Sequence, residues 1–214
     1  MISYVKIQWR NRLLDCLPFI SRWNEYRHLF QSAGRWRQEG WVTPPPYFIR
    51  RAMLLAEANA MGAKILVETG TFLGDTAWSF RNTFRQVYTI EVEPRLAELA
   101  RDRFKNVPSV AALEGDSSAV LTQVCPKIDG SCVFFLDGHY SGGSTGMGEK
   151  ECPVIEELEA IFQLMQHPYR IVIDDARLFG TDPAYPSIEA LGNFLAKCKP
   201  SMRLRIENDA IILW

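Results

Sequence analysis

Short, continuous apolar runs alternate along the chain with longer segments in which apolar residues recur at helical spacing. Continuous runs of this length are typical of strands that are buried on both faces of a sheet. They predict strands at 65–67, 87–90, 110–113, 133–136 and 171–173. The intervening pattern predicts helices over 47–61, from about 75, over 94–104, from about 117, over 152–165 and over 187–197.

Strands that alternate with helices in this way predict a parallel sheet covered by helices on both faces. The end of the chain breaks the alternation. Two apolar runs at 203–206 and 210–213 flank the turn-like pair Asn208 and Asp209, which predicts a closing β-hairpin. The fold class expected is therefore α/β, a doubly wound and mostly parallel sheet with a C-terminal antiparallel hairpin.

The first 46 residues differ from the rest of the chain. They are rich in aromatic and basic residues and end in the proline run 44–46, a stiff extended linker. Residues 1–51 hold nine Lys or Arg and three Asp or Glu, whereas the whole chain has a net charge of −1. We expect residues 1–46 to be a helical extension, serving as a cap or as an arm for homo-oligomer formation, and residues 47–214 to be the main domain. Weak peripheral contact with an anionic membrane is the alternative.

Composition limits the classes of protein to consider. The 214 residues are 47% hydrophobic and 23% charged, as in an ordinary globular protein. The five cysteines are scattered with no CxxC pair, which gives no support to a zinc knuckle and favours reduced thiols in the cytoplasm. No apolar run reaches the roughly 20 residues of a membrane span. The acidic main domain argues against a nucleic-acid partner.

Polar residues follow every predicted strand of the parallel sheet. Ligands of open α/β sheets bind at the carboxyl ends of the strands, so these residues are expected to converge. The five strand ends read Glu68 to Gly74, Glu91 to Glu93, Glu114 to Ser117, Asp137 to Tyr140, and Asp174 with Asp175. Each strand thus brings an acid or a glycine turn to one edge.

The turn after the first strand discriminates between ligands. Gly70 and Gly74 permit a tight turn and a close ligand, but Phe72 stands where a dinucleotide fingerprint has its second glycine. Acids at Glu68 and at the start of the next helix disfavour a phosphate there. Glu91, 21 residues after Gly70, is placed to accept hydrogen bonds from ribose hydroxyls. The pattern favours a nucleoside with positive charge and no phosphate.

The segments VETGTFLGDT, YTIEVEP and EGDS resemble the motif series of class I S-adenosylmethionine-dependent methyltransferases. The resemblance covers about 150 residues from Lys64 onward. It implies a seven-stranded sheet whose last strand is antiparallel. It also implies that S-adenosylmethionine is the cofactor, with Glu68 and Gly70 at its methionine end and Glu91 at its ribose. The other cofactor-binding residues implied are Thr71 and Gly74 in the turn, and Asp116 with Ser117 at the adenine. For Asp116, a helix N-cap is the alternative role.

Asp137, Asp174 and Asp175 are expected to lie close together at the ends of neighbouring strands. Three adjacent carboxylates repel one another, and a hard divalent cation such as Mg²⁺ relieves that repulsion. The pattern resembles bacterial metal-dependent O-methyltransferases of the catechol and macrocin types, in which acids at these strand ends hold the metal. Asp175 departs from the asparagine usual in the catechol type. A capped turn in which Arg177 pairs with the two acids is the structural alternative.

The catalytic lysine of the catechol type has no counterpart, and His139 stands in its place. His139, two residues from Asp137, is the candidate base because histidine titrates near neutral pH. A metal-ligand role and a structural hydrogen bond are its alternatives. The loop 138–150 contains five glycines and is either a lid or a plain connector.

The sequence predicts a methyltransferase that modifies a hydroxyl of a small molecule or glycan, with Asp137 and His139 as catalytic residues. Two alternatives remain open. One keeps the cofactor but uses His139 without a metal. The other is a non-catalytic protein that binds a nucleoside or serves as a scaffold. Use of NAD fits poorly because the glycine spacing is wrong.

Overall fold

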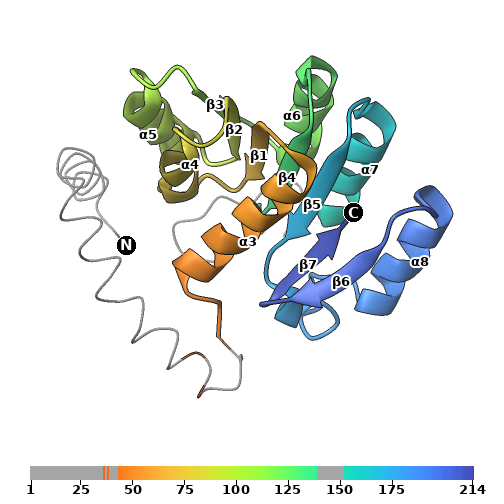
Figure 1. Cartoon of the computed structure of the whole chain (residues 1–214). Helices are drawn as coiled ribbons and strands as arrows, with labels where there is room; N and C mark the ends of the chain where they lie inside the picture. The colour runs from red at the N-terminus through yellow and green to blue at the C-terminus, as the bar shows by residue number, and fades with distance from the viewer. Residues whose placement is uncertain (1–35, 37, 39–42, 139–151) are drawn as a thin grey trace.

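The computed structural model describes residues 36, 38, 43–138 and 152–214. Within these ranges the chain forms a seven-stranded sheet in the order β3-β2-β1-β4-β5-β7-β6 (Figure 1). Most of the predicted extension 1–46 and most of the loop 138–150 lie outside the described residues. The division into residues 1–46 and 47–214 therefore stays a prediction.

Five parallel strands make up most of the sheet, and each covers a predicted apolar run. They are β1 (Ile65–Thr69), β2 (Gln86–Glu91), β3 (Val110–Glu114), β4 (Cys132–Leu136) and β5 (Tyr169–Ile173). Every residue of β1 and β4 is buried, because helices cover both faces of the sheet. The continuous apolar runs are thus explained by burial on two sides.

The predicted C-terminal hairpin is confirmed. Strands β6 (Leu204–Glu207) and β7 (Ala210–Leu213) are antiparallel to each other, and β7 is antiparallel to β5. Asn208 and Asp209 both adopt positive φ, which asparagine and aspartate tolerate better than most residues. The mostly parallel, doubly wound α/β sheet is therefore confirmed, with its antiparallel strands where the sequence predicts them.

One face of the sheet carries α3 (Tyr47–Met61), α4 (Asp75–Phe80) and α5 (Pro94–Phe104) (Figure 1). Met53, Leu54 and Ala58 of α3 pack with Phe80 and Phe104 in one apolar core. Helix α3 ends at Gly62, whose left-handed conformation lets its N–H bond to the carbonyl of Asn59. Its predicted limits, 47–61, are the observed ones.

The opposite face carries α6 (Ser117–Val124), α7 (Val154–Leu164) and α8 (Ile188–Cys198). The short helices η1 (Cys125–Lys127) and η2 (Ala176–Leu178) follow α6 and β5. A second apolar core lies under these helices. Ser187 accepts the N–H of Ala190 and so begins α8 one residue later than predicted.

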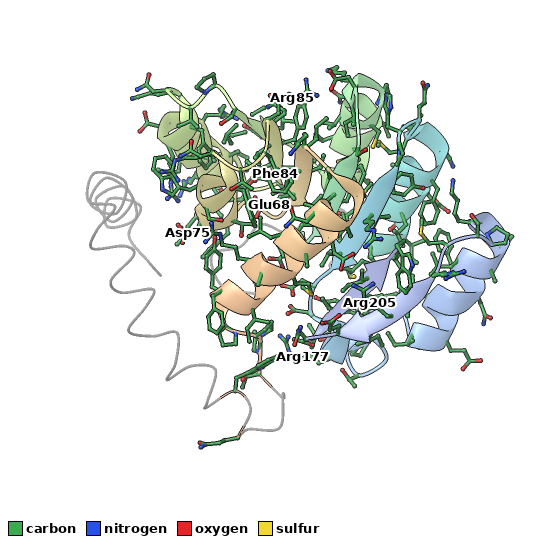
Figure 2. All side chains as sticks on the ribbon, in the orientation of Figure 1. Glu68, Asp75, Phe84, Arg85, Arg177 and Arg205 are labelled. Atoms are coloured by element: carbon green, nitrogen blue, oxygen red, sulfur yellow. The ribbon has the colours of Figure 1, made fainter. Side chains whose placement is uncertain are left out.

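Helix α3 is also held to the sheet by charge. Glu57 is 3% exposed, and its carboxylate pairs with Arg170 of β5 at 2.6 Å and with Arg205 of β6. Arg205, labelled in Figure 2, also lies over the ring of Trp214. A buried carboxylate needs such partners, because an unpaired charge away from water is costly. Glu57 therefore fixes the second half of α3 over β5 and the hairpin.

Among the described residues, no helix combines the length and the apolar composition needed to cross a membrane.

Candidate active site

The register of the sheet brings the predicted site residues to one level. Thr69 of β1 pairs with Ile90 of β2 and with Leu136 of β4, and Leu136 pairs with Ile173 of β5. The residues that follow these are therefore neighbours along the carboxyl edge. We call them the edge row, which consists of Glu91, Gly70, Asp137 and Asp174. Adjacent strands are about 4.8 Å apart, so members of the edge row that are neighbours can touch.

Gly70 is the tightest point of the edge row. Its φ is +82°, and a Cβ placed on it would lie 2.2 Å from the carbonyl oxygen of Asp137. The N–H of Asp137 in turn donates to the carbonyl of Thr69 at 3.2 Å. A side chain at position 70 is therefore excluded both by the backbone conformation and by its neighbour. The turn after β1 and the end of β4 are in direct backbone contact.

The turn after Gly70 is held by Glu91. Phe72 has a φ of 48°, and its N–H donates to Glu91 Oε2 at 2.7 Å. The other carboxylate oxygen of Glu91 accepts the N–H of Glu93 at 3.0 Å. Burial raises the pKa of Glu91, and these N–H groups oppose that rise. Glu91 thus organises the turn itself, a function in addition to the ribose contact that the sequence predicts.

Gly74 completes the turn as the N-cap of α4, with a φ of +76°. Arg103 of α5 donates to the carbonyl of Leu73 at 2.5 Å and pairs with Asp75 at 2.9 Å. Asp75 and Glu68 are labelled in Figure 2. The acid at the start of α4 is therefore paired with a cation from α5. That partner lies some 28 residues away in the sequence, and the sequence pattern gave no signal for it.

Glu68 lies beneath the turn and is 2% exposed. Thr89 donates to its carboxylate at 2.8 Å, and Thr71 lies 2.6 Å from the same threonine hydroxyl. The three side chains form a buried hydrogen-bonded chain that runs from Glu68 through Thr89 to Thr71. Burial raises the pKa of Glu68 to about 8, despite the threonine hydrogen bonds that oppose it. Glu68 is therefore largely protonated at neutral pH in this structure and would ionise readily beside a cation.

Asp116 and Ser117 lie at the start of α6. One carboxylate oxygen of Asp116 accepts the N–H groups of Ser118 at 3.0 Å and of Ala119 at 3.4 Å, so the N-cap role is observed. Ser117 is buried at 8% exposure. The capping bonds and the hydroxyl of Ser118 are all accepted by Oδ1 of Asp116. The adenine contact that the resemblance implies stays a prediction.

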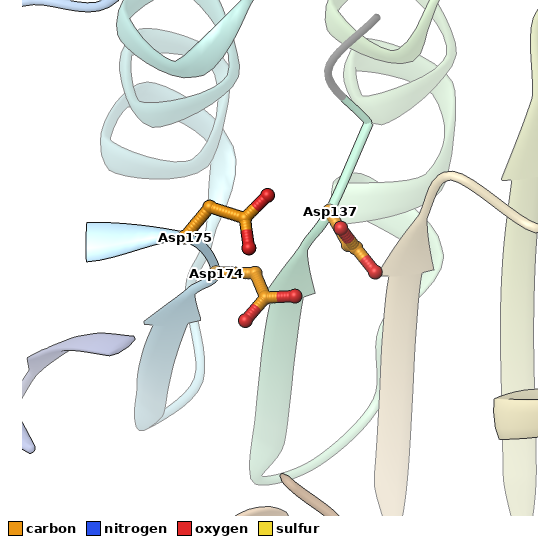
Figure 3. Close-up of side chains that lie close together, drawn as sticks. All are labelled: Asp137, Asp174 and Asp175. Atoms are coloured by element: carbon orange, nitrogen blue, oxygen red, sulfur yellow. The ribbon is translucent and has the colours of Figure 1, made fainter. Parts of the chain in front are cut away.

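Asp137, Asp174 and Asp175 come together as the sequence predicts (Figure 3). One carboxylate oxygen of each lies within 4.8 Å of the others. Asp174 and Asp175 are 1% and 7% exposed, and Asp175 has a φ of 57°. Burial and the neighbouring Asp174 raise the pKa of Asp137 well above its ordinary value, and Arg50 opposes this rise. We call these three residues the acid cluster.

Two arginines approach the acid cluster. Arg50 of α3 lies 2.5 Å from Asp174 Oδ2 and 3.7 Å from Asp137 Oδ2. Arg177, labelled in Figure 2, pairs with Asp175 at 2.7 Å and with Asp209. The predicted alternative, a turn stabilised by Arg177, is therefore observed for Asp175, whereas Asp174 pairs with Arg50. Sequence reasoning missed Arg50, which looks like one of two adjacent surface arginines on an amphipathic helix.

The donor chemistry of the acid cluster fits a hard divalent cation. All three ligands are carboxylates, which Mg²⁺ prefers. With Asp209 they supply four carboxylates against the two guanidinium groups of Arg50 and Arg177. The two arginines therefore offset half of the negative charge that these four carboxylates carry when ionised. The donor chemistry and the spacing of the carboxylates are both compatible with a metal.

A pocket adjoins the acid cluster on the side of α7. Its wall includes Asp174, Gly138, Glu157, Tyr185 and Phe179, with further apolar residues of β4, β5 and α7. In this conformation the pocket has room for about one water molecule beside the carboxylates. His139 and most of the glycine-rich loop lie outside the described residues, so the predicted base and lid are not placed by the structure.

The strand order and the closing hairpin are those of the class I S-adenosylmethionine-dependent methyltransferase fold, and solved structures agree. The O-methyltransferase TomG from Streptomyces achromogenes, involved in tomaymycin synthesis and solved in complex with S-adenosylmethionine, has a TM-score of 0.55 and 18% identity. The similarity to TomG covers 86% of this chain and 87% of that one. The chain therefore has the fold that the motif series implies.

Two further structures give the same result. A candidate caffeoyl-CoA O-methyltransferase from Staphylococcus aureus has a TM-score of 0.57 and 15% identity, over 90% of this chain and 97% of that one. An O-methyltransferase from Bacillus cereus in complex with S-adenosylhomocysteine has a TM-score of 0.52 and 16% identity, over 75% and 77%. The sequence itself matches no protein-family profile and no curated protein.

Replacing Gly70 with alanine should be strongly destabilising. The new Cβ would meet the Asp137 carbonyl at 2.2 Å, and alanine would be strained at a φ of +82°. We expect the free energy of unfolding, measured in urea, to fall by at least about 2 kcal/mol. The matched control is Gly192→Ala in α8, where a Cβ meets no atom within 4 Å. The free energy of unfolding of that variant should rise by about 0.5–1 kcal/mol, because alanine favours a helix more than glycine does. Equal effects at both positions would contradict the close contact.

Glu68→Gln should remove a pH dependence of stability. The pKa of Glu68 in the folded protein is about 8, above its ordinary value of 4.5, so the folded state binds this proton more tightly than the unfolded chain. The resulting stabilisation is complete below pH ~4.5 and is lost as the pH rises through about 8. Relative to E68Q, the wild type should lose about 1 kcal/mol per pH unit over this window.

Urea unfolding at pH 5, 6, 7 and 8 measures this difference. Glu98→Gln, an exposed position on α5, serves as the control and should follow the wild type at every pH. Parallel stability curves for the wild type and E68Q would show that the folded protein does not raise this pKa.

Proposed function

We propose that this chain is an S-adenosylmethionine-dependent methyltransferase that transfers a methyl group to a hydroxyl oxygen of a small molecule or glycan. The observation that carries the proposal is the edge row. It sets the glycine turn, a cofactor site in the fold family, in backbone contact with Asp137 of the acid cluster. A methyl donor and a hydroxyl acceptor would therefore meet at adjacent points of one sheet edge. Residues 47–214 would carry the activity.

On the donor side, we assign Gly70, Thr71 and Gly74 to the wall that the cofactor approaches. Glu91 would accept the ribose hydroxyls with lone pairs that remain after its two backbone hydrogen bonds. Asp116 and Ser117 would face the adenine. Glu68 favours a cationic ligand over a phosphate, because a positive charge nearby would stabilise its carboxylate form. The methionine end of S-adenosylmethionine supplies such a charge.

On the acceptor side, Asp137, Asp174 and Asp175 would hold a divalent cation such as Mg²⁺. When bound, such an ion lowers the pKa of a hydroxyl and fixes its position. The acceptor oxygen attacks the methyl carbon, and the carbon–sulfur bond breaks to leave a neutral thioether. The hydroxyl proton passes to a base, for which His139 is our candidate. Alignment of oxygen, carbon and sulfur contributes to the rate independently of the cation.

A second candidate function is methyl transfer without a metal. It is favoured by the ion pairs of Arg50 and Arg177 with the acid cluster, which supply positive charge from the protein itself. In that case His139 would act as base with Asp137 as its partner. Under both candidates, a small-molecule acceptor binds beside the acid cluster. Both also describe an enzyme that acts in the cytoplasm and has no nucleic-acid partner.

Binding of S-adenosylmethionine is the first test. We expect saturable binding by isothermal titration calorimetry. Glu91→Gln should weaken it by about tenfold or more, because a charge-assisted hydrogen bond to a ribose hydroxyl is lost. Glu114→Gln is the control, since this exposed acid ends the neighbouring strand β3. If the wild type binds NAD but not S-adenosylmethionine, or if neither ligand binds, the proposed function is wrong.

Asp137→Asn tests the cation. Transfer of labelled methyl groups from S-adenosylmethionine to a panel of phenols, catechols and sugars should fall by about 100-fold or more. Affinity for S-adenosylmethionine should stay within about threefold, because the contacts of Asp137 with Thr69 and Gly70 that the structure shows are made by its backbone, which the substitution keeps. EDTA should reproduce the loss in the wild type, and added Mg²⁺ should reverse it.

The matched control is Asp129→Asn, an exposed acid paired with Arg85. Its transfer rate should equal that of the wild type. Full transfer by D137N and by EDTA-treated protein would leave the metal-free candidate in place and exclude the metal-dependent one.

A further inference from the structure

Arg50 lies where a cation of the acid cluster would lie. Its Nη2 is 2.5 Å from Asp174 Oδ2, and its Nη1 is 3.7 Å from Asp137 Oδ2. Its guanidinium thus reaches the two acids that continue the edge row on β4 and β5. The alternation of side chains explains the encounter. Asp137 and Asp174 each lie two residues after Phe135 and Val172, so they point to the same face of the sheet. Phe135 and Val172 belong to the core beneath α3.

Arg50 also lies over the ring of Phe135, 5.7 Å from its centroid, but its place in the helix is unfavourable for a cation. Arg50 is the fourth residue of α3, close to the helix N-terminus, where the helix dipole disfavours positive charge. Its Nε is buried and has no hydrogen-bond partner within the part of the chain that the structure describes. The contact with Asp137 is too long for a hydrogen bond. The negative charge of the acid cluster therefore holds a guanidinium that is only partly satisfied.

We propose that Arg50 is the resident cation of the acid cluster and that it competes with a divalent ion for Asp174. The inference rests on the proposed cation site. A bound Mg²⁺ lies about 2.0–2.1 Å from its carboxylate ligands, which would place it among the oxygens that Arg50 now faces. Two cations at that separation repel each other. The ion would bind only as the guanidinium withdraws, and the side chain of Arg50 is 19% exposed, which leaves it a route to solvent.

Withdrawal of Arg50 would not release α3 from the sheet. Glu57, two turns further along the same face of the helix, keeps its ion pairs with Arg170 and Arg205. Met53 and Leu54 remain packed in the core between the two charged positions. Arg50 is therefore a positioning residue that sets when the acid cluster is open to a metal, and Glu57 is the fixed anchor.

The test is the affinity for Mn²⁺, measured by the loss of the free-ion electron paramagnetic resonance signal. Arg50→Met keeps the length and helix propensity of the side chain but removes the charge. We expect it to bind Mn²⁺ about tenfold more tightly than the wild type, or better. R50K keeps the positive charge on a shorter side chain, so its affinity for Mn²⁺ should lie between those of R50M and the wild type.

The matched control is Arg51→Met. Arg51 is the next residue of the same helix and, as Arg50 does over Phe135, lies over an aromatic ring, that of Phe80. Among the described residues, however, the ion pairs with Asp137 and Asp174 are made by Arg50 and not by Arg51. R51M should bind Mn²⁺ as the wild type does. The double variant R50M/D174N should lose the gain, because the ligand for which the two cations compete is gone.

Unchanged or weaker Mn²⁺ binding by folded R50M, or an equal gain in R51M, would overturn the inference. If R50M does not fold, the same comparison is made with R50K, whose affinity must then exceed that of the wild type. Affinity for S-adenosylmethionine is measured on the same proteins. Its absence from the wild type would remove the proposed methyltransferase function, whereas the Mn²⁺ comparison would still decide the role of Arg50.

Discussion

The register of the parallel strands is the constraint on which the site depends. Because β2, β1, β4 and β5 run side by side in the same direction, Glu91 at the end of β2 falls at the same level as the residues that follow the other three strands. Three of the four residues in the edge row are acids, and the fourth, Gly70, has no side chain. A slip of one residue between β1 and β4 would separate Gly70 from Asp137 and turn their neighbours to the opposite face. The pairing of the apolar strands therefore determines which polar residues of the edge row become neighbours.

The edge row and the acids next to it lie in a place that water reaches poorly, and the protein balances these acids by several means. Glu91 accepts backbone N–H groups, and Glu68 accepts threonine hydroxyls and retains its proton near neutral pH. Asp174 and Asp175 pair with arginines. This variety has a physical reason, since buried carboxylates are stable only when paired, hydrogen-bonded or protonated. It also leaves an edge at which an added positive charge is favoured over a phosphate.

Sequence reasoning recovered the fold almost completely, because periodic patterns report burial directly. The apolar runs gave all seven strands, and Gly62 marked the end of α3 at the observed residue. It also recovered the acid cluster, since strand ends on neighbouring strands must converge. Apart from Arg177, it missed the charged partners that neutralise the buried acids. Arg50, Arg103 and Glu57 act through contacts between distant segments, and a single charged residue on an amphipathic helix looks the same whether it faces solvent or a buried acid.

The same contacts determine which parts of the site can adapt. The backbone of Asp137 is fixed on one side by Gly70, where no atom could be added, and is bonded to Thr69 through its N–H. Asp174 is bonded through its own N–H to the carbonyl of Leu136 at 3.0 Å. The carboxylates therefore cannot move apart by shifting the strands, because packed interiors resist such displacement.

Any adjustment of the acid cluster to a new ligand has to come from side chains that approach it from outside the sheet. Among the described residues, Arg50 and Arg177 are the two whose ion pairs with the cluster are seen. Arg177 is also tied to Asp209 of the β6–β7 turn, whereas the ion pairs seen for Arg50 among the described residues are with the acid cluster. The side chain of α3 is thus the adjustable part of an otherwise rigid site.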